Sequence, residues 1–184
     1  MRTIPKPTSS TKSVRWGRWL GALGVLSLAS LVVAQISWGK ISSTAKYAWA
    51  ENLGWSNWAD ANSGTQGVEV RSTHLRGWIW LENAGWIRLN SGAPLNGSTF
   101  MNRDSSDYGV NISPKDELYG YGWSENLGWL NFDTRSKGTQ RARFDRATYR
   151  LRGFVWSENA GWINLESGPG GLQVVPTPRA SGAP

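Results

Sequence analysis

The chain of 184 residues contains no cysteine and only one histidine, His74. Without cysteine there is no disulfide, no thiolate metal ligand and no thiol nucleophile, so packing alone must stabilise the fold. A single histidine cannot form a two-histidine metal site, and no G-x-S-x-G turn lies near it. The glycines form neither a phosphate-binding loop nor a dinucleotide fingerprint. We therefore expect a non-enzymatic protein without cofactor or metal, in which His74 is an exposed turn residue.

Acidic residues are absent from residues 1–18, which hold five of the 20 basic residues of the chain. The net charge of +7 and the pI of 10.1 are therefore mainly properties of this tail. A domain that binds nucleic acid concentrates its basic residues on a folded face. We therefore expect no nucleic-acid partner.

Charged residues are also absent from residues 19–38, which as a helix would be about 30 Å long, enough to cross a bilayer. Trp16, Trp19 and Trp38 flank this segment and are predicted to anchor it at the two membrane interfaces. The basic tail predicts a cytoplasmic N-terminus, a single span of a bacterial inner membrane and a periplasmic main domain. The alternative is a secretory signal that is cleaved after Ala34, which would give a secreted protein.

Tryptophan is abundant, and eight of the 13 tryptophans lie in four copies of the pattern W-x-E-N-x-G-W, at residues 49–55, 80–86, 123–129 and 156–162. Aromatic and β-branched residues alternate with others on both sides of E-N-x-G, which is typical of two strands joined by a tight turn. Each copy is therefore predicted to be a β-hairpin. The residues assigned to the structural turns are Glu51, Asn52, Gly54, Glu82, Asn83, Gly85, Glu125, Asn126, Gly128, Glu158, Asn159 and Gly161.

Because side chains alternate along a strand, the two tryptophans of a copy lie on one face of the hairpin and residues such as Ile79 and Ile87 lie on the other. Both faces are therefore apolar, and we expect other parts of the protein to cover them. Additional short strands are predicted at 68–70, 110–112, 141–144 and 172–175. The expected fold is all-β, a repeat-built antiparallel sandwich or barrel with about eleven or twelve strands, of which the sandwich is the default. The predicted parts are a basic cytoplasmic tail, a transmembrane or signal helix, a β-repeat domain and a flexible C-terminal tail, at residues 1–18, 19–38, 41–176 and 177–184.

The four copies resemble the tandem G-x-x-W-x-E-N-x-G-W-I-x-[LF] repeats of diverse bacterial exported and surface proteins. The first copy departs from that pattern with Lys46 in place of glycine and Ser56 in place of isoleucine. The resemblance implies an envelope location and a repeat-built β fold. It implies no particular activity and no catalytic residues.

Four glutamates at equivalent positions suggest acid–base chemistry or calcium bound between repeats, but a residue needed for a turn would recur in the same way. We therefore assign these glutamates to the turns. The eight repeated tryptophans are expected in the core, and the loop at 90–108 is a candidate contact site because of its length. The aromatic residues expected at the surface are Trp58, Trp78, Tyr108 and Tyr119.

A run of basic residues with one acid among them suggests a positively charged surface. Its members are Arg135, Lys137, Arg141, Arg143, Arg146, Arg150 and Arg152. These residues either protect a solvated sheet edge or dock onto an acidic protein or lipid head groups.

The function predicted first is a non-catalytic, membrane-anchored accessory subunit, whose β-domain docks onto subunits of a larger membrane complex such as a respiratory or photosynthetic one. The alternative is a secreted or surface-tethered module that binds glycans or mediates adhesion through exposed tryptophan. A hydrolase that uses paired glutamates is the weakest of the three hypotheses.

Overall fold

The computed structural model describes residues 38–177, which form fifteen β-strands and one short 3-10 segment. The predicted tail and residues 19–37 of the predicted membrane helix, with Trp16 and Trp19, lie outside the described residues, as do residues 178–184. Trp38, predicted as the last residue of that helix and as a membrane-interface anchor, is instead a strand residue. The first strand begins at Trp38, earlier than the predicted domain start at 41. Among residues 38–177 no helix has the length and hydrophobicity needed to span a membrane.

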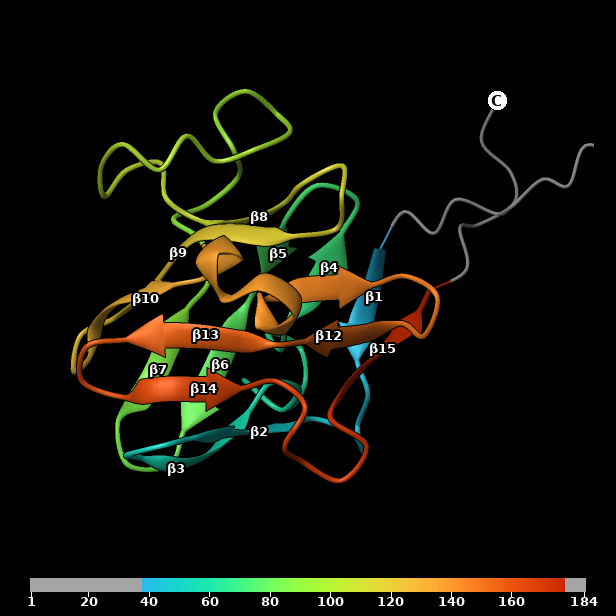
Figure 1. The fold of residues 1–184 in the computed structure, drawn as a ribbon. Coiled ribbons are helices and arrows are strands. Elements are labelled where there is room, and N and C mark those ends of the chain that lie inside the picture. The colour runs from blue at the N-terminus through green and yellow to red at the C-terminus, as the bar shows by residue number, and fades with distance from the viewer. Residues whose placement is uncertain (1–37, 178–184) are drawn as a thin grey trace, which may run out of the picture. The chain divides into compact units, whose positions relative to one another are not determined.

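Eight strands close a barrel in which every neighbouring pair is antiparallel (Figure 1). In their order around the barrel they are β2 (Tyr47–Ala50), β3 (Gly54–Asn57), β6 (Trp78–Leu81), β7 (Gly85–Arg88), β9 (Leu118–Ser124), β10 (Gly128–Asn131), β13 (Phe154–Ser157) and β14 (Gly161–Asn164). The pairing of β14 with β2 closes the ring. Each W-x-E-N-x-G-W copy forms one hairpin of this barrel, as predicted.

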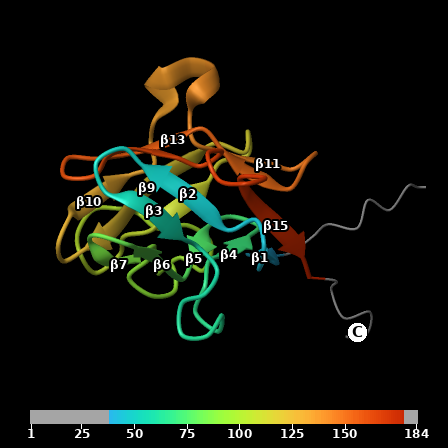
Figure 2. The same cartoon turned by 90° about the horizontal axis from the view of Figure 1, so that it is seen from below.

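Six of the seven remaining strands form a curled sheet beside the barrel (Figure 2). In sheet order they are β11 (Arg143–Asp145), β12 (Arg150–Arg152), β15 (Leu172–Pro176), β1 (Trp38–Ile41), β4 (Glu69–Arg71) and β5 (Leu75–Arg76). Strand β8 (Val110–Ile112) pairs with β9, and the 3-10 segment η1 (Arg135–Gln140) projects beside β13. The default sandwich is therefore wrong. The fifteen strands exceed the predicted number because three short strands were not predicted: β1, which precedes the first hairpin, and β5 and β12, which lead into the second and fourth hairpins.

The hairpin turns have the geometry that their sequence predicts. In the second hairpin the N–H of Ala84 donates to the carbonyl of Leu81 at 3.1 Å, and Leu81 pairs with Gly85, whose φ is 81°. This four-residue turn is followed by a glycine in the positive-φ region, which glycine adopts without strain. The equivalent glycines also have positive φ, at Gly54, Gly128 and Gly161.

Neighbouring turns are joined by hydrogen bonds around one end of the barrel. The side chain of Asn83 donates to the carbonyl of Leu53 in the preceding turn at 2.9 Å. The same bond recurs from Asn126 to Ala84 at 2.9 Å and from Asn159 to Leu127 at 3.2 Å. A backbone bond from Asn52 to Ala160 at 3.3 Å completes the ring. The repeated asparagines therefore connect each hairpin to its neighbour.

The inner face of the barrel carries small or aliphatic side chains, such as Ala48, Ser56 and Ile79, all of which are buried. An eight-stranded barrel has an interior only wide enough for side chains to fill it. Trp58 and Phe132 also lie in the core, with ring centroids 6.4 Å apart. The eight repeated tryptophans lie on the opposite, outer face, so the expectation that they form the core is wrong.

Candidate functional site

A continuous set of aromatic side chains, here called the aromatic belt, lies on the outer face of the four hairpins. It comprises the two tryptophans of each copy and the aromatic residue two positions before the first tryptophan, which are Tyr47, Trp49, Trp55, Trp78, Trp80, Trp86, Tyr121, Trp123, Trp129, Phe154, Trp156 and Trp162. The two tryptophans of a copy are direct cross-strand partners. Their ring centroids lie 5.1, 4.8, 4.7 and 4.8 Å apart in chain order. The first three pairs are edge-to-face and the fourth is tilted, and both arrangements are favourable contacts between aromatic rings.

Much of the aromatic belt is accessible to a partner. Trp49, Trp55, Trp80, Trp86 and Trp129 have exposed fractions of 39% to 46%. Exposed apolar surfaces of this kind are typical of interaction sites, because isolated proteins rarely leave large rings in water. The first three hairpins therefore offer binding surface.

The fourth hairpin is partly covered. Lys137, in η1, places its ammonium 4.5 Å from the centroid of the Trp162 ring, within the range of a cation–π contact. Trp156 and Trp162 are half-buried. The aromatic belt is therefore open on one side of the barrel and shielded by η1 on another.

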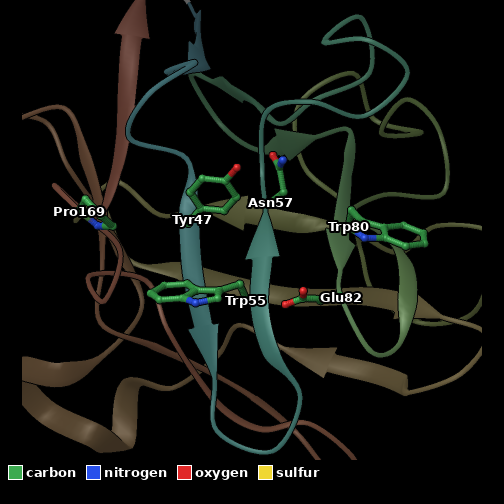
Figure 3. Close-up of a pocket in the computed structure, with 6 residues that line it drawn as sticks. All are labelled: Tyr47, Trp55, Asn57, Trp80, Glu82 and Pro169. Carbon is green, nitrogen blue, oxygen red and sulfur yellow. The ribbon is translucent and has the colours of Figure 1, made fainter.

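A groove between the first two hairpins, here called the first groove, has a volume of about 460 Å³. It is lined by Tyr47, Trp55, Asn57, Trp80, Glu82 and Pro169. Figure 3 shows the Tyr47 and Trp55 rings on the adjacent strands β2 and β3, with the Glu82 carboxylate between Trp55 and Trp80. Pockets for small ligands typically have about 300–1,000 Å³, mostly apolar with a few polar groups, and the first groove fits that description.

The loop that follows β14 supplies one side of the first groove and is held against β2. The Ser167 hydroxyl accepts the backbone N–H of Trp49 at 2.7 Å and donates to the carbonyl of Asn164 at 2.8 Å. A Cβ on Gly168 would lie 2.3 Å from the carbonyl oxygen of Tyr47, so only glycine allows this approach. The position of Pro169 in the groove depends on that contact.

The polar groups of the first groove differ in their availability. The Asn57 side chain accepts the N–H groups of Ala59 and Asp60 and donates to the Asp60 carboxylate at 2.8 Å, so it mainly shapes its own turn. The Glu82 carboxylate is exposed, and no group of residues 38–177 donates a hydrogen bond to it. Glu82 is therefore the main polar group that a ligand in this groove would meet.

Two of the four aromatic residues expected at the surface are buried, so those predictions are wrong. Trp58 is 1% exposed and donates its indole N–H to the Ser56 hydroxyl at 3.0 Å inside the core. Tyr108 is 7% exposed and packs on Trp129. Trp78 and Tyr119 are half-buried. The sequence offers no local signal for these positions, because both faces of each hairpin are largely apolar and burial depends on how the strands close.

Four of the seven basic residues form ion pairs with acidic side chains, some nearby in the sequence and some distant. Arg152 contacts Asp145 at 2.8 Å and Glu166 at 2.5 Å. Arg135, Arg141 and Arg146 pair with Asp133, Glu117 and Asp116, respectively. Lys137, Arg143 and Arg150 make no ion pair with another residue of the described range. The structure therefore brings most of the predicted group together around β11 and β12, but as a mixed-charge surface.

His74 is half-buried rather than exposed. Its ring packs edge-on against Phe100 at 5.4 Å, and its Nδ1 lies 3.2 Å from the carbonyl oxygen of Ser98. Burial lowers the pKa of His74 below its ordinary value. The four turn glutamates Glu51, Glu82, Glu125 and Glu158 are exposed, and residues 38–177 contain no cluster of three acidic or histidine side chains able to hold a metal.

Comparison of the chain with protein-family models, with curated proteins and with solved structures finds no match. Its resemblance to exported repeat proteins remains a prediction from the four copies. We therefore infer the function from the geometry of the aromatic belt and its grooves.

Proposed function

We propose that this protein is a non-catalytic carbohydrate-binding module of the bacterial envelope, with the first groove as its main site. The observation that carries the proposal is the pair of exposed rings, Trp55 and Trp80, on either side of the unpaired Glu82 carboxylate. A sugar ring has an apolar C–H face and a rim of hydroxyl groups. The indole faces would stack on the C–H face, while the carboxylate would accept hydrogen bonds from the hydroxyls.

The pairing of the tryptophans would favour such binding. Each groove indole is already held by its cross-strand neighbour, at 5.1 Å for Trp55 and 4.8 Å for Trp80. A ligand would therefore order little protein on binding, which lowers the entropic cost of association. Repetition of the same unit around the barrel would present several such surfaces, consistent with a repeat-built origin of the domain.

The test uses the full-length chain in mild detergent, titrated calorimetrically with a panel of neutral oligosaccharides, including cellohexaose and a hexamer of N-acetylglucosamine. Trp55→Ala and Trp80→Ala should each weaken binding about tenfold or more, since loss of a central aromatic anchor typically costs about 2 kcal/mol. Trp129→Ala is the matched control, because this residue is 43% exposed but does not line the first groove. Absence of binding across the panel, or equal losses in all three variants, would refute the proposal.

The docking subunit predicted from the sequence is the second candidate. Arg143 and Arg150, on the adjacent strands β11 and β12, form no ion pair within the described part of the chain and could meet an acidic partner. Replacing both with glutamate should then remove co-purifying proteins from native membranes. Intact mass of the same material would show whether the chain is full-length, as anchoring by residues 19–38 requires, or begins at Gln35.

A further inference from the structure

A second groove of about 320 Å³ lies between the loop at 90–108 and the third hairpin. It is lined by Asn102, Arg103, Asp104, Tyr108, Tyr121 and Trp129. Tyr121 and Trp129 belong to the aromatic belt and are 38% and 43% exposed. The ring of Trp129 lies 5.0 Å from that of Tyr108 and 6.0 Å from that of Tyr121, so three rings form one aromatic wall.

The loop side of the second groove is held by buried hydrogen bonds. The side chain of Asn111, which is fully buried, accepts the N–H of Phe100 at 2.8 Å and donates to its carbonyl at 2.9 Å. The side-chain oxygen of Asn102 accepts the backbone N–H of Gly109 at 3.0 Å, and the backbone N–H of Asn102 donates to the carbonyl of Asp107 at 2.8 Å. These bonds fix the segment that carries Arg103 and Asp104 beside the aromatic wall. The groove is therefore formed before any ligand arrives.

The charges of the second groove differ from those of the first. Asp104 is occupied locally, since its carboxylate accepts the N–H and the hydroxyl of Ser106 at 2.8 and 2.6 Å, and these bonds lower its pKa. Arg103 is exposed and forms no ion pair with any residue between 38 and 177. The second groove thus carries the exposed Arg103 guanidinium beside the Asp104 carboxylate, whose Oδ1 is hydrogen-bonded to Ser106, whereas the first groove offers the Glu82 carboxylate with no cationic residue among the described residues of its lining.

We propose that the second groove is a separate binding site for a sugar unit that carries a carboxylate. The sugar ring stacks on Trp129 while Arg103 binds the carboxylate through paired charge-assisted hydrogen bonds, a geometry that guanidinium favours. The first groove would repel the same ligand through Glu82. This inference rests on the proposed carbohydrate-binding function and adds a second ligand class to it.

The two grooves are separated along the barrel. The first uses β2, β3 and β6, and the second uses β9 and β10, with β7 between them on one side and β13 and β14 on the other. One molecule could therefore hold an acidic chain and a neutral chain at the same time. Binding of both would join two polysaccharides and would raise the avidity of the module for mixed material.

The test is calorimetric titration of the full-length chain in mild detergent with a galacturonic acid hexamer and with its carboxyl-reduced counterpart, a galactose hexamer. The acidic hexamer should bind more tightly, and Arg103→Gln should weaken its binding about tenfold, the loss expected for a charge-assisted contact of about 1.5 kcal/mol. Trp129→Ala should weaken it as well. Trp55→Ala, in the first groove, should leave it unchanged, and circular dichroism should show that all variants are folded.

Three results would overturn the second site: equal affinity for the acidic and reduced hexamers, no effect of Arg103→Gln, or loss of acidic binding in Trp55→Ala. The panel of neutral oligosaccharides tests the first groove independently, because Arg103→Gln should not affect it. Neutral binding with no acidic preference would therefore refute only the second site. Acidic binding that depends on Arg103, with no neutral binding, would refute only the assignment of the first groove.

Discussion

Replacing single tryptophans tests the division between a barrel interior and an exposed aromatic belt. Trp58 is 1% exposed, packs against Phe132 at 6.4 Å and donates to Ser56 at 3.0 Å. Trp49 is 42% exposed, and its main ring contact is Trp55 at 5.1 Å. Trp58→Ala and Trp49→Ala remove the same side chain from these two environments.

The expected losses in the free energy of unfolding differ between these two variants by at least a factor of three. Trp58→Ala opens a cavity in the core and leaves the Ser56 hydroxyl without its indole partner, which together should lower the free energy of unfolding by about 3–5 kcal/mol. Trp49→Ala removes one cross-strand aromatic pair, worth about 1 kcal/mol. Trp58→Phe should lie between the two variants, because it retains a buried ring and loses the indole N–H.

Guanidinium denaturation followed by far-ultraviolet circular dichroism measures these changes without relying on tryptophan fluorescence. The midpoints should fall in the order wild type, Trp49→Ala, Trp58→Phe and Trp58→Ala, with similar slopes if unfolding remains two-state. A loss of about 3 kcal/mol or more in Trp49→Ala would mean that the belt is buried in the folded protein. That result would refute both the barrel interior described above and the binding surface inferred from it.

Three further predictions follow from local contacts. Asn83→Ala removes the bond to the Leu53 carbonyl and should lower the free energy of unfolding by about 1 kcal/mol in the same denaturation assay. A hydrogen bond from the Thr148 side chain and, to a smaller extent, one from the Arg152 guanidinium lower the pKa of Asp145 to about 2. Ionised Asp145 therefore stabilises the fold fully above its pKa in the unfolded chain, about 3.9, and this contribution is lost as the pH falls through the folded pKa of about 2. Asp145→Asn lacks the contribution, so its free energy of unfolding should change less between these two pH values. Gly168→Ala should weaken neutral-oligosaccharide binding by displacing Pro169, whereas Gly92→Ala, where a Cβ meets nothing within 4 Å, should not.

The four hairpins could be predicted because each depends on neighbouring residues. Alternation of side chains defines two strands, and the E-N-x-G turn joins them with a glycine such as Gly85 at φ 81°. The strands near residues 68–70 and 110–112 were also predictable, since short alternating segments lie between polar turns. These features require no knowledge of what the hairpins pack against.

The assignment of interior and exterior could not be derived in the same way. Ile79 and Trp80 lie on opposite faces of β6, and both are apolar, so hydrophobicity alone does not say which one faces the core. Closure of eight strands leaves an interior only wide enough for side chains to fill it, which here suits Ala48, Ser56 and Ile79 and leaves the paired tryptophans outside. The charges show the same dependence on long-range contacts, since Arg152 meets Glu166 from a loop beyond the fourth hairpin.

The repeated β-hairpins, their turns and the alternation of side chains along each strand follow from short stretches of consecutive residues, so they could be predicted before the fold was known. The tertiary structure alone decided that the hairpins close into a barrel, that tryptophan lies outside it and that two grooves form between distant segments. Closure, burial and charge pairing all depend on which strands are neighbours, and the packing of the whole domain determines these neighbours.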